Sequence, residues 1–159
     1  MLVQFPKKPA PESGRTKISQ IFAANMDFVR VPHPVTLYST RVAAGMPSPA
    51  EYYEEEKLDL NEHLLQNPEH TFFVRVTGES MIGAGIHAGD LLVVDRSLSP
   101  SNGRIVIAVV NGELTVKKLF KEKSSLYLMP ENPSYPSIEI SEDTDFMIWG
   151  VVTNVIHSL

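Results

Sequence analysis

The hydrophobic residues that follow Thr71 are spaced as in β-strands. Phe72, Val74 and Val76 alternate with more polar positions, which is the period-two pattern of a half-buried strand. Later apolar runs are compact and bounded by turn residues, as is typical of buried strands. These runs predict further strands at residues 91–95, 105–110, 114–119, 126–129, 138–140 and 146–156. We therefore expect a mostly β body.

Glycine and asparagine mark the turns of this body. Gly78 follows the first strand and permits a backbone shape that a residue with a Cβ resists, so that Ser80 is presented at the tip of a tight turn. Asn111-Gly112 predicts a two-residue hairpin. Gly150 predicts a bend or bulge within the last strand. That strand, 146–156, has two open roles: an edge for a dimer, or an internal strand of the core.

Two short helices are expected before the β body. Ser48-Pro49-Ala50-Glu51 combines a capping box with proline at the first helical position, which predicts a helix over about 49–57. Asp59-Leu60-Asn61-Glu62 is a second capping box, and the helix it begins runs through Leu65 and stops at Asn67-Pro68. Both helices are short, so the β body determines the fold class.

The segment before these helices is rich in proline and has little sustained periodicity. It contains one helical candidate at 18–29, and 35–39 can form a strand if another segment offers an edge. The run Val31-Pro32-His33-Pro34 prevents the further helices that a helix-turn-helix needs. We therefore predict an N-terminal arm over 1–47 and one β domain over 48–159.

The composition is ordinary for a soluble globular protein. No apolar run reaches the length of a membrane span, and no secretory signal follows Met1, so we expect a cytoplasmic protein without a membrane partner. The chain has no cysteine, which excludes disulfides, thiol nucleophiles and cysteine-ligated zinc.

Charge is distributed unevenly along the chain. Residues 1–44 hold six basic and two acidic groups, whereas the remainder holds eight basic and seventeen acidic groups. A basic leader can bind nucleic acid or fold back on its own acidic body. Because the leader has no basic helix and no interleaved aromatic residues, we favour the second interpretation and expect little direct DNA binding.

Ser80 is either an ordinary turn residue or a nucleophile, and a nucleophilic serine needs a base. None of the five histidines stands in a recognisable triad context or at a metal-ligand spacing, so we interpret them as surface residues and expect no metal or cofactor. They are His33, His63, His70, His87 and His157.

Lysine is the other possible base. Its amine is protonated in water at neutral pH, with a reference pKa near about 10.4, but burial in an apolar pocket favours the neutral form. Lys117 follows the predicted hairpin, and strand alternation places it opposite to Val116 and Lys118 and on the side of Thr115. The pattern alone also fits a surface lysine.

Three separated motifs, in this order and spacing, resemble the LexA/UmuD family of Ser–Lys autoproteases. They are Gly78-Glu79-Ser80-Met81, the run 87–95 (HAGDLLVVD) and the run 112–119 (GELTVKKL). The resemblance covers about residues 41–159. It implies a C-terminal β body of strongly bent sheets, preceded by two short helices and an extended arm.

The same resemblance implies the chemistry and its context. Ser80 is then the nucleophile, Lys117 the general base, and Ala44-Gly45 the bond that the protein cuts in itself. In such a mechanism the backbone N–H groups of Ser80 and Glu79 can form the oxyanion hole. It also implies a homodimer that is activated by a RecA–single-stranded DNA filament during the SOS response to DNA damage. The processed form then serves a UmuC-type Y-family translesion polymerase.

Other functions also fit parts of this pattern. A LexA-type repressor shares the catalytic body but needs a DNA-binding domain that residues 1–44 cannot form, so the chain can be a related regulator without that domain. A signal-peptidase-like enzyme shares the Ser–Lys chemistry but normally needs a membrane anchor. A binding module of the same fold without catalysis is expected if Ser80 and Lys117 do not meet.

Overall fold

The computed structural model describes residues 32–38, 42, 44–45 and 55–159. The chain divides into two compact units, Met1–Asp59 and Leu60–Leu159. The helical candidate at 18–29 lies outside the described residues, as does most of the predicted arm over 1–47. The predicted domain boundary at 47/48 stays a prediction.

In the first unit, β1 (Val35–Tyr38) pairs antiparallel with β2 (Glu55–Leu58). The strand expected near 35–39 therefore has the edge that it needs. Lys57 Nζ donates to Thr36 Oγ1 across the pair at 3.2 Å.

The helix predicted over 49–57 is wrong where the structure describes it, because Glu55, Glu56 and Lys57 belong to β2. Local helix preference is a weak effect, and pairing with β1 satisfies the backbone groups of this segment instead. Positions 49–54 lie outside the described residues. The second helix is confirmed as α1 (Leu60–Leu64), where Leu65 N–H donates to the Asn61 carbonyl at 2.9 Å, and the 3-10 turn η1 (Pro68–His70) comes next.

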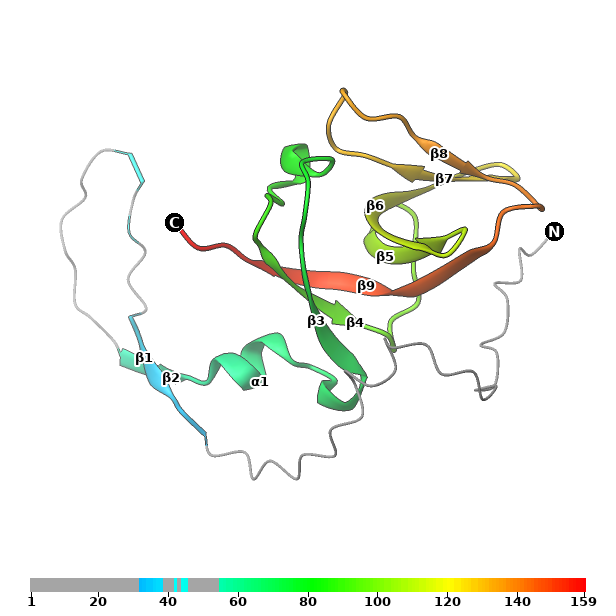
Figure 1. The fold of residues 1–159 in the computed structure, drawn as a ribbon. Coiled ribbons are helices and arrows are strands. Elements are labelled where there is room, and N and C mark those ends of the chain that lie inside the picture. The colour runs from blue at the N-terminus through cyan, green and yellow to red at the C-terminus, as the bar shows by residue number, and fades with distance from the viewer. Residues whose placement is uncertain (1–31, 39–41, 43, 46–54) are drawn as a thin grey trace. The chain divides into compact units, whose positions relative to one another are not determined.

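The second unit is built on one antiparallel sheet with the strand order β3-β4-β9-β5-β6-β7-β8 (Figure 1). Each of the seven strands coincides closely with a run predicted from the hydrophobic pattern, so the mostly β fold is confirmed. The strands are β3 (Thr71–Arg75), β4 (Leu91–Asp95), β5 (Ile105–Val110), β6 (Glu113–Glu122), β7 (Ser125–Met129), β8 (Ile138–Ile140) and β9 (Phe146–Ile156).

β9 is an interior strand of this sheet, which is the second of the two roles that the sequence left open. Its first half pairs with β5 and its second half with β4. The pairing with β5 shifts register next to Gly150, where a Cβ would lie 2.7 Å from the Val94 side chain and 2.9 Å from the Asp95 carbonyl oxygen. The irregularity predicted at Gly150 is therefore confirmed, and close contact with β4 explains the glycine.

The hairpin predicted at Asn111-Gly112 joins β5 to β6. Both residues have positive φ, 49° and 84°, which is the backbone shape that the tightest hairpin turns require. Its position matters because β6 carries Lys117.

The core has two apolar clusters, and successive residues of β5 and β9 contribute to different clusters. Strand alternation accounts for this division, since Ile107 and Val152 belong to one cluster and Val106 and Val151 to the other. Burial of both kinds of position explains why β5 is apolar throughout.

Candidate active site

Ser80 lies on the connection between β3 and β4 (Figure 1). This loop is closed at its base by two backbone hydrogen bonds, from Val76 N–H to the Asp90 carbonyl and from Gly89 N–H to the Val76 carbonyl, each 2.9 Å long. Gly78 has a φ of 83°, as its position in the turn predicted. Met81, directly after Ser80, is only 1% exposed and anchors the turn in the core. The serine is therefore held on a short, anchored turn.

Ser80 and Lys117 meet in space. Lys117 Nζ lies 2.8 Å from Ser80 Oγ, although 37 positions separate the two residues in the chain. The same nitrogen lies 3.1 Å from Thr115 Oγ1 and 3.0 Å from the Val116 carbonyl oxygen. Three oxygen atoms thus surround the amine, and one of them belongs to the candidate nucleophile.

Lys117 is buried, with 7% of its surface exposed. Val106, its partner across the β5–β6 pair, and Leu119 share its side of the sheet, and both are buried. Within the described residues, no carboxylate forms an ion pair with the Lys117 ammonium. Burial therefore lowers the pKa of Lys117 below its usual value of 10.5, since the charged form loses its hydration without gaining a counter-ion.

The segment after β7 braces the Ser80 turn. Glu131 N–H donates to the Ser80 carbonyl at 2.9 Å, and the Glu131 carbonyl accepts from Gly83 N–H at 2.7 Å. Asn132 Nδ2 donates to the Glu79 carbonyl at 2.9 Å. These contacts hold the backbone on both sides of the nucleophile and leave its hydroxyl free to face Lys117.

Lys118, the neighbour of the buried lysine, takes part in the same support. Its Nζ forms an ion pair of 2.8 Å with Glu131 Oε1. The two adjacent lysines of β6 therefore act on opposite parts of the site, because Lys117 contacts the Ser80 side chain and Lys118 contacts the residue that holds the Ser80 backbone. Sequence reasoning missed Glu131 and Asn132, since both contact the backbone of a loop about 50 positions earlier in the chain.

Gly83 has a specific steric role in this support. A Cβ at this position would lie 2.5 Å from the Glu131 carbonyl oxygen, far inside ordinary van der Waals contact. The close approach of the two backbones therefore requires glycine. The sequence showed a glycine-rich loop here but gave no sign of the partner.

The predicted cleavage residues, Ala44 and Gly45, lie in the first unit at a bend, and both are exposed. Val42 is 93% exposed. Glu79, a candidate for the oxyanion hole, is exposed next to Ser80 in the second unit.

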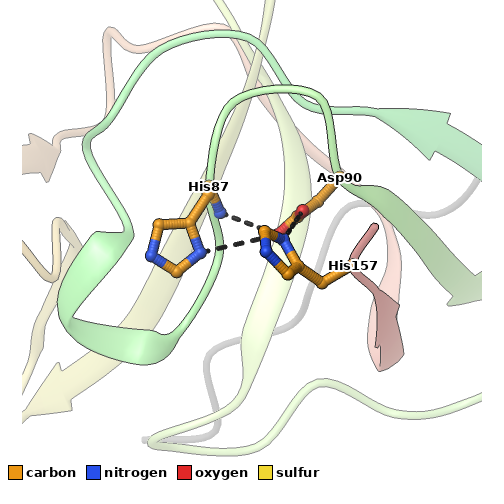
Figure 2. Close-up of side chains that lie close together, drawn as sticks. All are labelled: His87, Asp90 and His157. Carbon is orange, nitrogen blue, oxygen red and sulfur yellow. Dashed lines mark hydrogen bonds and ion pairs between the residues drawn. The ribbon is translucent and has the colours of Figure 1, made fainter. Parts of the chain in front are cut away.

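The prediction that histidines lie at the surface holds for His87 and His157, whose side chains are 51% and 48% exposed. Both nevertheless gather around the buried carboxylate of Asp90, as Figure 2 shows. His157 Nδ1 lies 2.6 Å from Asp90 Oδ1, and the backbone N–H of His87 donates to Asp90 Oδ2 at 2.8 Å. The hydrogen bonds from the His87 backbone and from His157 hold the pKa of Asp90 below its usual value.

No pattern in the sequence indicates this cluster. Asp90 and His157 are 67 positions apart, and only the pairing of β9 with β4 brings them together. Two imidazoles and one carboxylate are residue types that bind transition metals.

Among the described residues, no helix is both long enough and apolar enough to cross a membrane.

Comparison with known proteins matches residues 36–153 to a family model described as Peptidase S24-like. The chain is 46% identical to Protein MucA of Escherichia coli over 128 residues, which cover 80% of this chain and 85% of that protein. It is 49% identical to Protein SamA of Salmonella typhimurium over 121 residues, 76% of this chain and 84% of that protein. It is also 40% identical to LexA repressor 1 of Xanthomonas campestris over 118 residues, 74% of this chain and 58% of the repressor.

Proposed function

The chain belongs to the peptidase S24-like family, and we propose that it is a serine endopeptidase that cuts its own chain between Ala44 and Gly45. The family match spans residues 36–153 and so includes Ser80, Lys117 and the proposed cleavage residues. The resemblance to the LexA/UmuD family that the three motifs indicated is confirmed by this match and by the similar proteins.

The observation that carries the proposal is the 2.8 Å distance between Lys117 Nζ and Ser80 Oγ. This is the hydrogen-bond distance that proton transfer between a nucleophile and its base requires. The surroundings of the amine suit both of its protonation states. As an ammonium it donates to all three neighbouring oxygens. As a neutral amine it donates to the Val116 carbonyl and to Thr115 Oγ1, and its lone pair faces the Ser80 hydroxyl.

In the first step, neutral Lys117 takes the proton of the Ser80 hydroxyl while Ser80 Oγ bonds to the Ala44 carbonyl carbon. The tetrahedral intermediate collapses, the C–N bond to Gly45 breaks, and the Lys117 ammonium gives its proton to the departing amine. Water then attacks the ester between Ala44 and Ser80 while Lys117 accepts a proton from it, and the Lys117 ammonium gives this proton to the departing Ser80 Oγ. The cycle returns Ser80 and Lys117 to their starting forms and uses one water molecule.

The backbone N–H groups of Glu79 and Ser80 are candidates for the oxyanion hole, which stabilises the negative oxygen of the intermediate. Support comes from the bracing of this turn, in which the Glu79 and Ser80 carbonyls are both engaged by the segment after β7. In the described part of the chain, neither of these two N–H groups donates to a protein acceptor. Both therefore remain available to a substrate oxygen.

Small residues and tethering favour the bond between Ala44 and Gly45 as the substrate. Neither residue has bulk beside the attacked carbonyl, and both lie at an exposed bend. Because substrate and enzyme belong to one chain, the effective concentration of the scissile bond is high. The rate then depends on how often the cleavage segment reaches Ser80 and how often Lys117 is neutral.

The proposed context is the SOS response to DNA damage. In this proposal a homodimer in the cytoplasm contacts a RecA–single-stranded DNA filament, which speeds self-cleavage, and the shortened dimer joins a UmuC-type Y-family polymerase for translesion synthesis. Similarity to the proteins MucA and SamA over most of their length supports this context over that of a repressor. The close approach of Ser80 and Lys117 argues against a binding module without catalysis.

Mass spectrometry of the purified chain tests both the chemistry and the context. The chain is incubated at neutral pH with and without activated RecA filament, alongside the Ser80→Ala variant. We expect fragments 1–44 and 45–159 to accumulate faster with filament, and the variant to stay intact. Cleavage at another bond, or equal cleavage of the variant, would contradict the proposed chemistry. Cleavage that the filament does not accelerate would contradict the proposed context alone.

A further inference from the structure

His87, Asp90 and His157 form a second candidate site within the second unit (Figure 2). His87 and Asp90 come from the two sides of the loop that enters β4, and His157 follows the last residue of β9. One potential ligand atom from each residue lies within 4.8 Å of the other two. The self-cleavage reaction proposed above uses none of these three residues.

We propose that His87, Asp90 and His157 bind a divalent transition-metal ion of the zinc type. Two imidazole nitrogens and one carboxylate oxygen are ligands that zinc accepts, and three protein ligands leave a fourth position for water. The absence of cysteine from the chain does not weaken such a site, since none of its ligands is a thiolate.

The geometry is close to that of a bound state. Zinc bonds to nitrogen and oxygen are about 2.0–2.2 Å long, so ligand atoms in a tetrahedral site lie roughly 3.4 Å apart. The present separations extend from the 2.6 Å between His157 Nδ1 and Asp90 Oδ1 to at most 4.8 Å. Reaching the bound arrangement therefore needs side-chain shifts on the order of 1 Å. About half of each imidazole side chain is exposed, which leaves room for this movement and a path for the ion.

The carboxylate is already oriented by the protein. Asp90 is 2% exposed, its Oδ2 accepts the backbone N–H of His87, and its own carbonyl closes the loop through Val76 N–H. Such outer contacts fix the position of a ligand before the metal binds. The buried, fixed member of the set is thus the carboxylate, and the other two members are half-exposed imidazoles that face solvent.

An ion pair between Asp90 and His157 is the simpler interpretation, but it leaves the position of His87 unexplained. His87 Nδ1 lies 3.9 Å from Asp90 Oδ2, too far for a hydrogen bond, yet its ring centroid is 5.3 Å from that of His157. Two charged imidazoles would repel each other at this distance. One metal ion bound to two neutral rings accounts for all three positions.

Zinc binding is measured by isothermal titration calorimetry on the untagged full chain in the Ser80→Ala background, which keeps the chain intact. We expect one zinc ion per chain, and at least a tenfold loss of affinity in the double variant His87→Gln/His157→Gln. His63→Gln is the matched control, because His63 is exposed on α1 and outside the cluster, and it should bind as the parent does. Circular dichroism of the metal-free proteins confirms that the variants fold.

Two further readouts separate this site from loose binding to surface histidines. At a zinc concentration about 100-fold above the dissociation constant, the melting temperature of the parent should rise by at least about 5 °C, and the double variant should show no rise. X-ray absorption spectra of the one-to-one complex should show two imidazole ligands. Absence of saturable one-to-one binding, unchanged affinity in the double variant, or an equal loss in His63→Gln would overturn the proposal.

Discussion

Gly83→Ala tests whether the backbone contact between Gly83 and Glu131 sets the geometry of the dyad. The new Cβ would meet the Glu131 carbonyl oxygen at 2.5 Å, whereas ordinary contacts begin near 3.4 Å. The two segments must therefore separate by up to nearly 1 Å. Since the neighbouring group is backbone, no side-chain rotation relieves the overlap. Overpacking of this kind costs about 1–3 kcal/mol of stability.

The effect on catalysis should exceed the effect on stability. Glu131 N–H also holds the Ser80 carbonyl, so displacing Glu131 moves the nucleophile relative to Lys117. A misplacement of about 1 Å costs on the order of 100-fold in rate. We expect Gly83→Ala to remain folded at 25 °C and to cleave itself roughly 100 times more slowly than the wild type.

The assay tracks the fragment 45–159 on gels over time at alkaline pH, and denaturant unfolding measures stability. Gly85→Ala is the matched control, because it makes the same change two residues away. Gly85 has a φ of 73° and open space around its Cβ position, so alanine there adds backbone strain without overlap. It should cost about 1 kcal/mol of stability and leave the cleavage rate of the folded protein within about threefold. A Gly83→Ala protein that is folded and cleaves at the wild-type rate would refute the reasoning.

Three further predictions concern side chains. Burial lowers the pKa of Lys117, and only the neutral amine accepts a proton. The cleavage rate, measured by gel time courses, should therefore rise from pH 7 until the pH passes that pKa. A flat or falling rate would contradict a lysine base. Thr115→Val removes one hydrogen-bond acceptor of the Lys117 amine and should slow cleavage about fivefold, whereas Thr115→Ser should retain the rate. A valine variant that cleaves as fast as the wild type would show that Thr115 does not orient the amine. Burial acts to raise the pKa of Asp95, but hydrogen bonds from Asn67 and Ser97 outweigh this effect and lower the pKa. The Asp95 carboxylate therefore stabilises the fold above the pKa of an unfolded Asp, and this stabilisation is lost as the pH falls through the lower folded pKa. Denaturant unfolding between pH 2 and 5 should therefore show a shallower acid loss in Asp95→Asn than in wild type, and identical slopes would contradict this role.

The strands and their hairpin could be predicted from the sequence because their signals are local. Alternation at Phe72 and Val74 and the Asn111-Gly112 turn depend on neighbouring residues only, and the structure confirms them. The helix expected to reach Lys57 was wrong at its described end, because pairing with β1 outweighs local preference there. Long-range pairing cannot be read from a capping box.

The candidate site was only partly predictable. Strand alternation left Lys117 as either a base or a surface residue, and the family resemblance, not the pattern, joined it to Ser80. The contacts of Glu131 with Ser80 and Gly83 depend on backbone atoms that any residue carries. The cluster around Asp90 depends on the pairing of β9 with β4, so no spacing of residues in the sequence predicts it.

Intact-mass spectrometry of the chain after incubation at pH 10 tests the central claim most directly. The wild type should yield two fragments whose masses correspond to 1–44 and 45–159, while Ser80→Ala and Lys117→Arg, in which the guanidinium cannot act as a base, should remain whole. Matching fragments from either variant, or a wild-type chain cut at any bond other than Ala44–Gly45, would contradict a Ser80–Lys117 self-cleaving protease.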